Sequence, residues 1–429
     1  MWIENAMVER EVLIDRSPGE VRVAVLANGR LEQFLVERTH APWKVGSLVL
    51  ARVTATRPEL GAVFVDLGGW EGYLAVTPDK KLTEGQMILV QVVAEASGTK
   101  ATRVSTDITL VGVWTTLTPG RSVHSIARRI TAKTERARFH KILNEALPEG
   151  MGGTVRAEAR GRDPSSIRAD VLSLVDRWFA VEDRVRTGDI GTVEPSPGLL
   201  GLGHRLAAEA VLVEGRDGVL FRERGVDAMV ETALARRVEL PCGGVLIFDE
   251  TEALTAIDID TAQSRSAVLD LSELAREASE RIAWEIRLRR IAGLILADFP
   301  RSRRLKFRMT FEEGLKRAFS ATGGERPNLH GWTKGGLFEI TRTRQGPSLR
   351  AQLYREGEPN PETLALEALR LVLRESAGIA RPRLICPNPV RLALLGPLGA
   401  ALEVTNRRLG GMLKLEIGSN GREICVDGG

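Results

Sequence analysis

The segment from residue 243 to 299 constrains the fold most, because it reads as two strands, a helix and a further strand. The two strands, GGVLIFD and ALTAIDID, flank a turn at Glu250 and Thr251. Apolar residues at helical spacing then predict a helix over 271–290. The short apolar run GLILADF, residues 293–299, is predicted to be a buried strand. A strand, a crossover helix and another strand make an α/β unit, so the fold class expected here is α/β.

Residues 46–95 are dense in short strands that are separated by turns containing Gly or Pro. Strands at this spacing are typical of a small closed barrel, and we expect an OB fold. Before them, residues 11–36 alternate as strands around turns at Pro18 and Asn28. The N-terminal part of the chain is therefore predicted to be rich in β structure.

The remaining segments predict further helices and loops. Amphipathic helices are expected at 134–147 and 165–179, and the Gly- and Pro-rich stretch 191–203 reads as a boundary. A polar linker, REGEPNPET, precedes a helix that opens at Pro361, and a small α/β tail follows. At 429 residues the chain has room for about three domains, so we expect a multidomain α/β protein.

Composition excludes several classes of protein. Hydrophobic residues make up 43% and charged residues 27%, as in an ordinary globular protein and unlike a disordered one. No apolar run is long enough for a transmembrane helix, and the acidic first dozen residues do not read as a signal peptide. The cysteines Cys242, Cys386 and Cys425 lie far apart, which excludes a CxxC metal knuckle and a disulfide framework. We expect a reducing, cytoplasmic location.

The cations are mostly arginine. Lys and Arg number 60 against 56 Asp and Glu, and ten of the 60 are lysine. Arginine contacts phosphate at two points, so an Arg-rich basic chain is a candidate nucleic-acid binder. The alternative is the arginine-rich codon usage of a GC-rich genome, and composition leaves both open.

Three aspartates lie at the ends of the predicted α/β strands. Asp258 and Asp260 share one face of their strand because they are two residues apart, and Asp298 ends the next strand. Carboxylates that converge at strand ends form a hard oxygen site for Mg²⁺ or Mn²⁺. Such an ion could activate a water and neutralise a phosphoryl oxygen. The alternative is that these aspartates cap or pair structurally.

A strongly cationic stretch surrounds the third of these aspartates. Residues 281–308 contain nine Lys or Arg and two acids, a local charge of +7. Carboxylates beside such a surface suit the metal-dependent cutting of a polyanion, and binding there should weaken steeply with salt. The alternative is a solvated face.

Aromatic and basic residues of the barrel suggest a site for single strands. Phe64 and Tyr73 fall on adjacent predicted strands, with Lys44, Arg52 and Lys100 nearby. OB folds hold single-stranded nucleic acid on aromatic platforms with cations. The alternative for Phe64, within the apolar run AVFVDL, is a place in the core.

Further arginines could share a phosphate. They are Arg128 and Arg129, which are adjacent, and the group Arg156, Arg160, Arg162 and Arg168. A solvated face is the alternative for each. His204 and His330 are isolated and read as structural, and we find no Ser/His/Asp arrangement and no Walker or GxGxxG loop.

With these segments in place, the chain resembles the ribonuclease E/G family. The residues that carry the resemblance are GGVLIFDETEALTAIDID, REASERIAWEIRLRRIAG, LILADF and GGLFEITRTRQGPSL. Upstream, ARVTATRPELGAVFVDLG and EGYL are similar to that family's S-one-type OB fold, and ARRI followed by LPEGMGGTVR is similar to its 5′-sensor region. The resemblance extends from about residue 8 to past residue 410, and the length is similar to that of the family's shorter members.

The resemblance implies five parts. They are a split ribonuclease-H-like subdomain (1–40 and 190–234), an inserted OB-fold RNA-binding barrel (41–113), a 5′-sensor region (114–189), a DNase-I-like catalytic domain (235–355) and a small α/β C-terminal domain (361–429).

The resemblance also implies an activity, namely Mg²⁺-dependent endonucleolytic cleavage of single-stranded RNA. The products would carry 5′-phosphate and 3′-hydroxyl ends, and the processes would be rRNA and tRNA maturation and mRNA decay. The family's two metal-binding aspartates fall on Asp258 and Asp298, and the position that is commonly Asn falls on Asp260. We take these three as catalytic, with Mn²⁺ as an alternative ion.

RNA-binding residues follow in the same way. The family's OB aromatics fall on Phe64 and Tyr73, its basic OB-loop residue on Lys100 and its sensor arginine on Arg156. Beside the catalytic residues, our candidates for contacts with the RNA backbone are Lys334, Arg342 and Arg344.

The sequence departs from the family at three points. Ala157 replaces the Thr that usually follows the sensor arginine, and Arg301 replaces a second Asp after the DF motif. The Cys-Pro-x-Cys zinc link is missing from AQLYREGEPNPET, so we predict no zinc and no zinc-tied dimer, although another homo-oligomer stays open. These departures leave a second hypothesis, an RNA-binding paralogue with little or no cleavage. A third, a basic protein with a non-nucleic ligand, predicts no salt-sensitive RNA binding.

Overall fold

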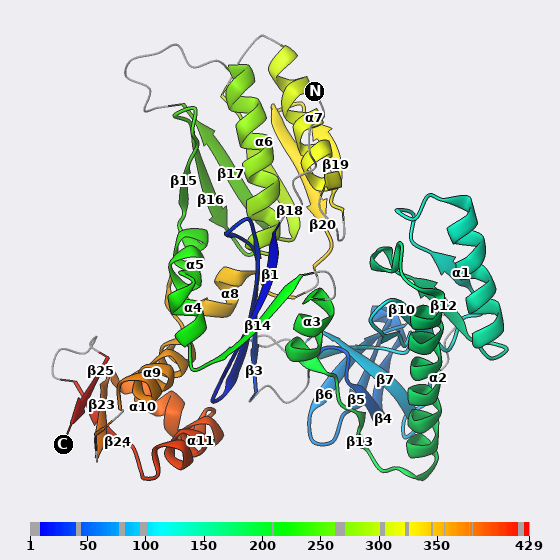
Figure 1. The fold of residues 1–429 in the computed structure, drawn as a ribbon, viewed down its shortest axis with the longest axis horizontal. Helices are drawn as coiled ribbons and strands as arrows, with labels where there is room; N and C mark the ends of the chain where they lie inside the picture. Colours follow the sequence, from blue (N-terminus) through cyan, green and yellow to red (C-terminus); the bar gives the residue numbers. More distant parts are fainter. Residues whose placement is uncertain are drawn as a thin grey trace. The chain divides into compact units, whose positions relative to one another are not determined.

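In the computed structural model the chain forms two compact units (Figure 1). Unit 1 is made from residues 1–40 and 210–429, and unit 2 from residues 41–209. The structure describes residues 9–39, 44–76, 82–94, 101–207, 210–261, 271–300, 305–321, 326–344, 346–355, 357–376, 378–379, 381–418 and 424–428.

A six-stranded mixed sheet is the largest element of unit 1, with the strand order β15-β16-β17-β18-β20-β19. Its strands are β15 (Arg237–Glu239), β16 (Val245–Glu250), β17 (Leu254–Asp260), β18 (Gly293–Asp298), β19 (Asn328–Trp332) and β20 (Leu337–Arg342). β17 and β18 are parallel and the other neighbours are antiparallel. The chain passes from β17 to β18 through α6 (Leu271–Leu288), as the sequence pattern predicts.

Two helices, α6 and α7 (Leu305–Ala321), pack on one face of this sheet (Figure 1). Ile257 and Ile259 of β17 and Ile295 of β18 are buried against apolar side chains of both helices. Because alternate strand residues point to opposite faces, the residues between them lie on the face away from α6 and α7. The core therefore fixes which face carries the carboxylates.

A second sheet of unit 1 has the order β14-β1-β2-β3. Its strands are β1 (Arg10–Ser17), β2 (Glu20–Ala27), β3 (Arg30–Arg38) and β14 (Val211–Arg216), and the helices α4 (Val219–Glu223), α5 (Val226–Leu234) and α8 (Leu349–Leu353) accompany it. β14 pairs with β1 in parallel, although 193 residues separate the end of β1 from the start of β14 in sequence.

The C-terminal part of unit 1 is a small α/β assembly. It contains β21 (Tyr354–Arg355), β22 (Glu358–Pro359), α9 (Pro361–Glu375), β23 (Pro382–Cys386), α10 (Asn388–Leu395), α11 (Gly399–Leu409), β24 (Lys414–Ile417) and β25 (Cys425–Gly428). The expected polar linker includes the β21–β22 ribbon. α9 begins at Pro361 as predicted, because the Asn360 side chain accepts a hydrogen bond from the Glu362 amide at 3.0 Å.

Unit 2 contains the closed five-stranded barrel expected from the sequence, which is OB-like. Its strands are β4 (Leu48–Arg57), β5 (Ala62–Asp66), β6 (Glu71–Ala75), β7 (Met87–Ala94) and β8 (Thr102–Ser105), with the short 3-10 helix η1 (Pro58–Leu60) between β4 and β5. The order β4-β5-β6-β8-β7 closes where β7 pairs with β4. Val63, Val65 and Leu74 are among the buried residues that fill the barrel.

The rest of unit 2 is a second, four-stranded sheet with helices. The four strands are β9 (Leu110–Val111), β10 (Thr115–Thr118), β11 (His124–Ile126) and β12 (Gly152–Val155). The helices are α1 (Lys133–Ala146), η2 (Ala157–Ala159), α2 (Pro164–Thr187) and α3 (Gly198–Leu206), and a further strand, β13 (Gly191–Glu194), pairs with β4 of the barrel. α2 runs beyond the predicted helix because Val181 continues its buried face. Residues 191–203, read as a boundary from their Gly and Pro content, contain β13 and the start of α3. β13 arises through pairing with β4, a contact that local sequence does not contain.

Among the described helices, none combines the length and the apolar character needed to cross a membrane.

Candidate active site

Two aspartates lie directly opposite each other on the parallel strands of unit 1. Asp258 of β17 and Asp298 of β18 are register partners, and both are exposed. Asp260 follows two residues later on β17 and is half-buried. All three lie on the sheet face away from α6 and α7. Since neighbouring strands are about 4.8 Å apart, the carboxylates of Asp258 and Asp298 can reach one ion.

The electrostatics of this group indicate converging negative charge. Partial removal of the Asp258 carboxyl from water raises its pKa, and the carboxylates of Asp260, Asp298 and Asp249 raise it further. The repulsion is a cost that a bound cation would remove. The structure therefore places the three predicted catalytic residues close enough for their charges to interact.

The donor set fits a hard divalent cation in an open site. Mg²⁺ is commonly held by one or two carboxylates, with waters and substrate phosphates completing its octahedron. Asp258 and Asp298 would supply these two carboxylates. Among the residues that the structure describes, no three His, Cys, Asp or Glu side chains form a metal-binding group on their own. The site thus fits an ion held jointly with substrate better than a closed protein cage.

We expect divalent-cation binding at this site to weaken as the pH falls. The raised pKa of Asp258 means that this carboxyl keeps its proton at a pH where an ordinary Asp is ionised, so the proton competes with the ion. Calorimetric titration with Mn²⁺ between about pH 8 and about pH 4, around the ordinary range of Asp, measures this. Affinity independent of pH would contradict the prediction.

The same shift sets the sign of the stability effect without an ion. Because the pKa of Asp258 is raised in the folded state, its protonated carboxyl contributes stability at low pH, and this contribution is lost as the pH rises through the folded-state pKa. Asp258→Asn should therefore raise the melting temperature at neutral pH relative to the wild type, and the difference should vanish in acid. Asp176→Asn, which changes an exposed aspartate of α2, is the matched control.

The three basic candidates beside the site are not brought together. Lys334 is exposed in the turn between β19 and β20, close to Leu337, the register partner of Asp298. Arg342 lies opposite Gly293 at the other end of β18, about 17 Å away along the strand. Its Nη1 donates to the carbonyls of Ile286 and Ile291, at 3.2 and 3.0 Å.

Arg344 is exposed and follows Arg342, at the same distant end of the sheet. Two other residues named from the sequence, Lys100 and Arg301, lie outside the described residues. Of the basic candidates, Lys334 is thus the one that the structure places at the carboxylate edge.

Sequence reasoning missed Arg308 as a site residue and counted it only within the cationic stretch. Its guanidinium lies 4.8 Å above the Trp332 ring. An added Cβ at Gly336, in the turn that carries Lys334, would lie 3.8 Å from Nη2 of Arg308. Arg308 is therefore held at the sheet edge where Asp298 ends its strand. Nothing in the local sequence indicates this, because Trp332 and Arg308 meet only after folding.

Phe64 and Tyr73 meet on the outside of the barrel in unit 2. They are register partners on β5 and β6, with ring centroids 6.1 Å apart and planes at 68°. Both are half-buried and neither belongs to the barrel core. The core alternative for Phe64 is therefore wrong, because Val63 and Val65 on either side point inward.

Arg103, which the sequence did not single out, extends this aromatic pair. It lies on β8 directly opposite Tyr73 and is exposed. Phe64, Tyr73 and Arg103 thus form a row across three neighbouring strands of the barrel, called the barrel row below. The alternation in TRVS could have indicated an outward Arg103, but its partner strand could not be read from sequence.

The three arginines of the expected sensor region come together at one sheet end. Arg128 and Arg129 are exposed in the turn after β11, and Arg156 follows β12. β11 and β12 are parallel, with Ile126 opposite Val155. This register brings the turn and Arg156 to the same edge.

The Arg156 guanidinium contacts two backbone carbonyls and one carboxylate. Its Nη1 donates to the carbonyls of Gly112 and Val113, at 3.4 and 3.1 Å, and Nη2 lies 3.5 Å from Glu158. Ala157 begins η2 and offers no hydroxyl.

Three other residues weighed from the sequence are engaged in structural contacts. Arg162 lies 4.7 Å above the Trp114 ring, and Arg168 pairs with Glu145 at 2.9 Å. Nε2 of His330 is 2.7 Å from the Thr341 hydroxyl. Structural roles account for these three side chains.

Comparison with known proteins gives consistent matches. The sequence profile of the ribonuclease E/G family matches residues 109–200 and 202–345. Ribonuclease G of Escherichia coli K12 is 27% identical over 95% of this chain and 96% of its own length. Ribonuclease G of Haemophilus influenzae is 28% identical over 85% of this chain and 87% of its own. Ribonuclease E of Nostoc is 30% identical over 76% of this chain and 55% of its own.

Proposed function

This chain belongs to the ribonuclease E/G family, and on that premise we propose that it is a Mg²⁺-dependent endoribonuclease acting on single-stranded RNA. The observation that carries the proposal is the in-register pair of Asp258 and Asp298 at the end of two parallel strands. Both lie within the part of the chain that the family profile matches.

Different residues of unit 1 bind the ion, orient the water and contact the phosphate. Asp258 and Asp298 would hold the cation, and Asp260 accepts a hydrogen bond from the attacking water and orients it. When bound, the ion supplies positive charge that polarises a phosphoryl oxygen and makes water more acidic. Lys334 and Arg308 donate to non-bridging phosphate oxygens and stabilise the charge that develops in the transition state. Attack by water with departure of the 3′ oxygen leaves 5′-phosphate and 3′-hydroxyl ends.

The residues of unit 2 hold the RNA. Bases stack on Phe64 and Tyr73, and Arg103 contacts the backbone, with Lys100 as a further cation. The 5′ end is contacted by Arg128, Arg129 and Arg156. Without a hydroxyl at Ala157, the preference for a 5′-monophosphate is weaker than a Thr would give. We extend the proposal to a cytoplasmic role in rRNA and tRNA maturation and mRNA decay.

We predict that Phe64→Ala and Tyr73→Ala each weaken the binding of single-stranded RNA by about 1–3 kcal/mol, because each removes a stacking surface. Their salt dependence should match that of the wild type, since no charge is lost. Arg103→Gln should instead lower the slope of log affinity against log salt by about one. Fluorescence anisotropy at several salt concentrations measures both effects. Leu60→Ala, an exposed apolar residue of η1, is the matched control. If Leu60→Ala loses as much RNA affinity as these variants, the barrel row is not part of the RNA-binding surface.

The activity is tested by incubating the protein with a fluorescent single-stranded RNA, with and without Mg²⁺. Cleavage that requires Mg²⁺ supports the endoribonuclease. The second candidate function is an RNA-binding paralogue that does not cut, and it is motivated by Ala157 and Arg301, which replace the Thr and the second Asp of the family. Tight binding without product at any Mg²⁺ concentration selects this candidate.

A further inference from the structure

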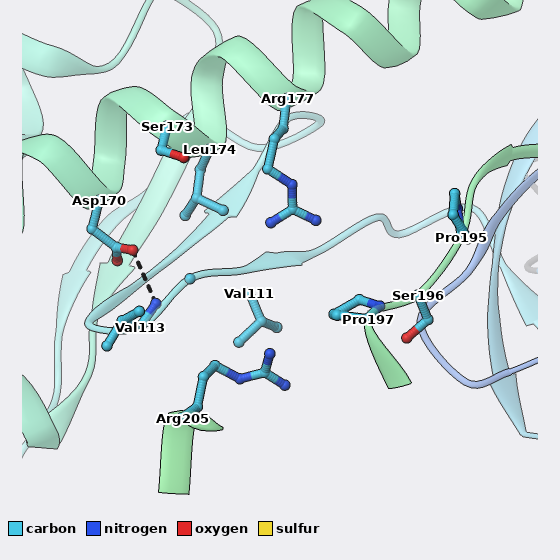
Figure 2. A pocket seen from close by; sticks show the side chains of 11 residues that line it. Val111, Val113, Asp170, Ser173, Leu174, Arg177, Pro195, Ser196, Pro197 and Arg205 are labelled. Atoms are coloured by element: carbon cyan, nitrogen blue, oxygen red, sulfur yellow. Dashed lines mark hydrogen bonds between the residues drawn. The ribbon is translucent and has the colours of Figure 1, made fainter. Parts of the chain in front are cut away.

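Unit 2 contains a pocket that the proposed function does not use. It lies between α2, α3, β13 and the turn after β9, with a cavity volume of about 480 Å³ (Figure 2). Binding sites for small molecules commonly have volumes of this order. Arg177 of α2 and Arg205 of α3 direct their guanidinium groups into it.

Arg205 is the residue that most needs a ligand. Its side chain is half-buried and has no hydrogen-bond or ion-pair partner within the described part of the chain. Burial lowers the pKa of Arg205, and the nearby guanidinium groups of Arg156 and Arg177 lower it further. A cation that is partly removed from water among other cations is relieved by an anion.

The acids beside the pocket are already engaged. The Asp170 carboxylate accepts hydrogen bonds from the amides of Val113, Trp114 and Thr115 at 2.8–2.9 Å, and from the Thr115 hydroxyl at 2.7 Å. Glu194 accepts from Nε of Arg177 at 3.1 Å and from its Nη2. That pairing leaves Nη1 of Arg177 free to donate into the pocket. Of the described residues that line the pocket, none has a carboxylate left over to neutralise Arg205.

The rest of the lining suits the remainder of a nucleotide. Pro195 and Pro197 present apolar surface on the side of α3, and Leu174 does so on the side of α2. The Ser196 hydroxyl accepts from the Gly198 amide at 3.1 Å and keeps its own proton to donate. Apolar walls with a few convergent donors are the usual composition of a ligand site.

We propose that this pocket binds the phosphate group of a nucleotide, with Arg205 and Arg177 as its guanidinium ligands. The phosphate comes either from a free mononucleotide or from the RNA chain. The first source is independent of the proposed nuclease function, and the second rests on it. Two arginines around one phosphate give charge-assisted hydrogen bonds in a fixed geometry.

The test is calorimetric titration of the full-length protein with AMP, with inorganic phosphate and with adenosine. We expect AMP and phosphate to bind and adenosine to bind at least tenfold more weakly than AMP. Arg205→Gln should weaken AMP binding about ten- to a hundredfold, the effect of losing a hydrogen bond to a charged group. Arg186→Gln, which removes an exposed cation from α2, the helix that carries Arg177, is the matched control and should bind as the wild type does.

Arg205→Lys keeps the charge but loses the two-point contact, so its affinity should lie between those of the wild type and Arg205→Gln. This ordering, in variants with the same melting temperature, excludes an effect through misfolding. Equal AMP affinity in the wild type and Arg205→Gln would overturn the proposal, as would the absence of AMP and phosphate binding.

Single-stranded RNA with a 5′-phosphate or a 5′-hydroxyl distinguishes the sources. If Arg205→Gln weakens only the phosphorylated RNA, the pocket takes a terminal phosphate. If it weakens both, the pocket takes a phosphate within the chain. Both results support the pocket. Because these readouts are binding, a protein that does not cleave RNA but binds AMP through Arg205 would refute the nuclease proposal and leave this one standing.

Discussion

Replacing Asp298 with Asn is expected to lower the rate of Mg²⁺-dependent RNA cleavage by at least about a thousandfold, or about 4 kcal/mol in the activation free energy. Asn keeps the shape of the side chain but removes one of the two carboxylates opposed on β17 and β18. RNA affinity measured without divalent ions should stay within about twofold of the wild type, since the expected stacking surface lies in unit 2. Gel-resolved cleavage of a labelled RNA measures the rate.

The matched control is Glu252→Gln, which removes an exposed negative charge just before β17, at the end of the strand far from Asp258. This control should cut at the wild-type rate. If Asp298→Asn cuts as fast as the control, the metal-site proposal fails. If neither the variants nor the wild type cut RNA but all bind it, the non-cleaving paralogue is the better description.

Replacing Glu20 with Gln is expected to destabilise unit 1 by about 3–5 kcal/mol, because it leaves a buried cation without its partner. Nη1 of Arg370, on α9, donates to the Glu20 carboxylate of β2 at 2.5 Å, and both side chains are over nine-tenths buried. Burial lowers the pKa of Arg370, and the neighbouring charge of Arg22 lowers it further. Urea unfolding measures the loss of stability.

A double variant supplies the control for Glu20. Replacing Glu20 with Leu and Arg370 with Met removes both charges and should be close to the wild type in stability, or more stable. If the single and double variants lose the same stability, the effect comes from packing rather than from the unpaired charge. If instead the unpaired charge is the cause, hydrogen exchange of the α9 amides should be faster in the single variant only, because this helix carries Arg370.

Short-range patterns in the sequence were sufficient for the α/β unit and its carboxylates. The two-residue spacing in ALTAIDID predicted that Asp258 and Asp260 share one face of their strand, and the crossover helix predicted that Asp298 ends the next strand. The structure agrees, because parallel strands joined by a helix share one edge. Only the one-to-one register of Asp258 and Asp298 required coordinates.

Positions that depend on long-range pairing could not be predicted. Arg342 lies only five residues after Leu337 in sequence, but β20 is antiparallel to β18 and carries Arg342 to the opposite edge. Arg103 and Arg205 were not predicted as site residues for the same reason. Arg103 lies beside Tyr73 and Arg205 beside Arg177, and both neighbours are distant in sequence. Closeness along a strand is a poor guide to closeness at a site.

The pairing of β13 with β4 has a consequence for how such a chain can be rearranged. Leu48, near the start of unit 2, is the register partner of Glu194, near its end. On the other side of the junction, Val12 of β1 pairs with Leu212 of β14, so the flanking chain closes on itself without unit 2. A module whose ends meet can be grafted, excised or exchanged for another as a cassette. Evolution could thus have altered the part expected to grip RNA without disturbing the register of the strands around it.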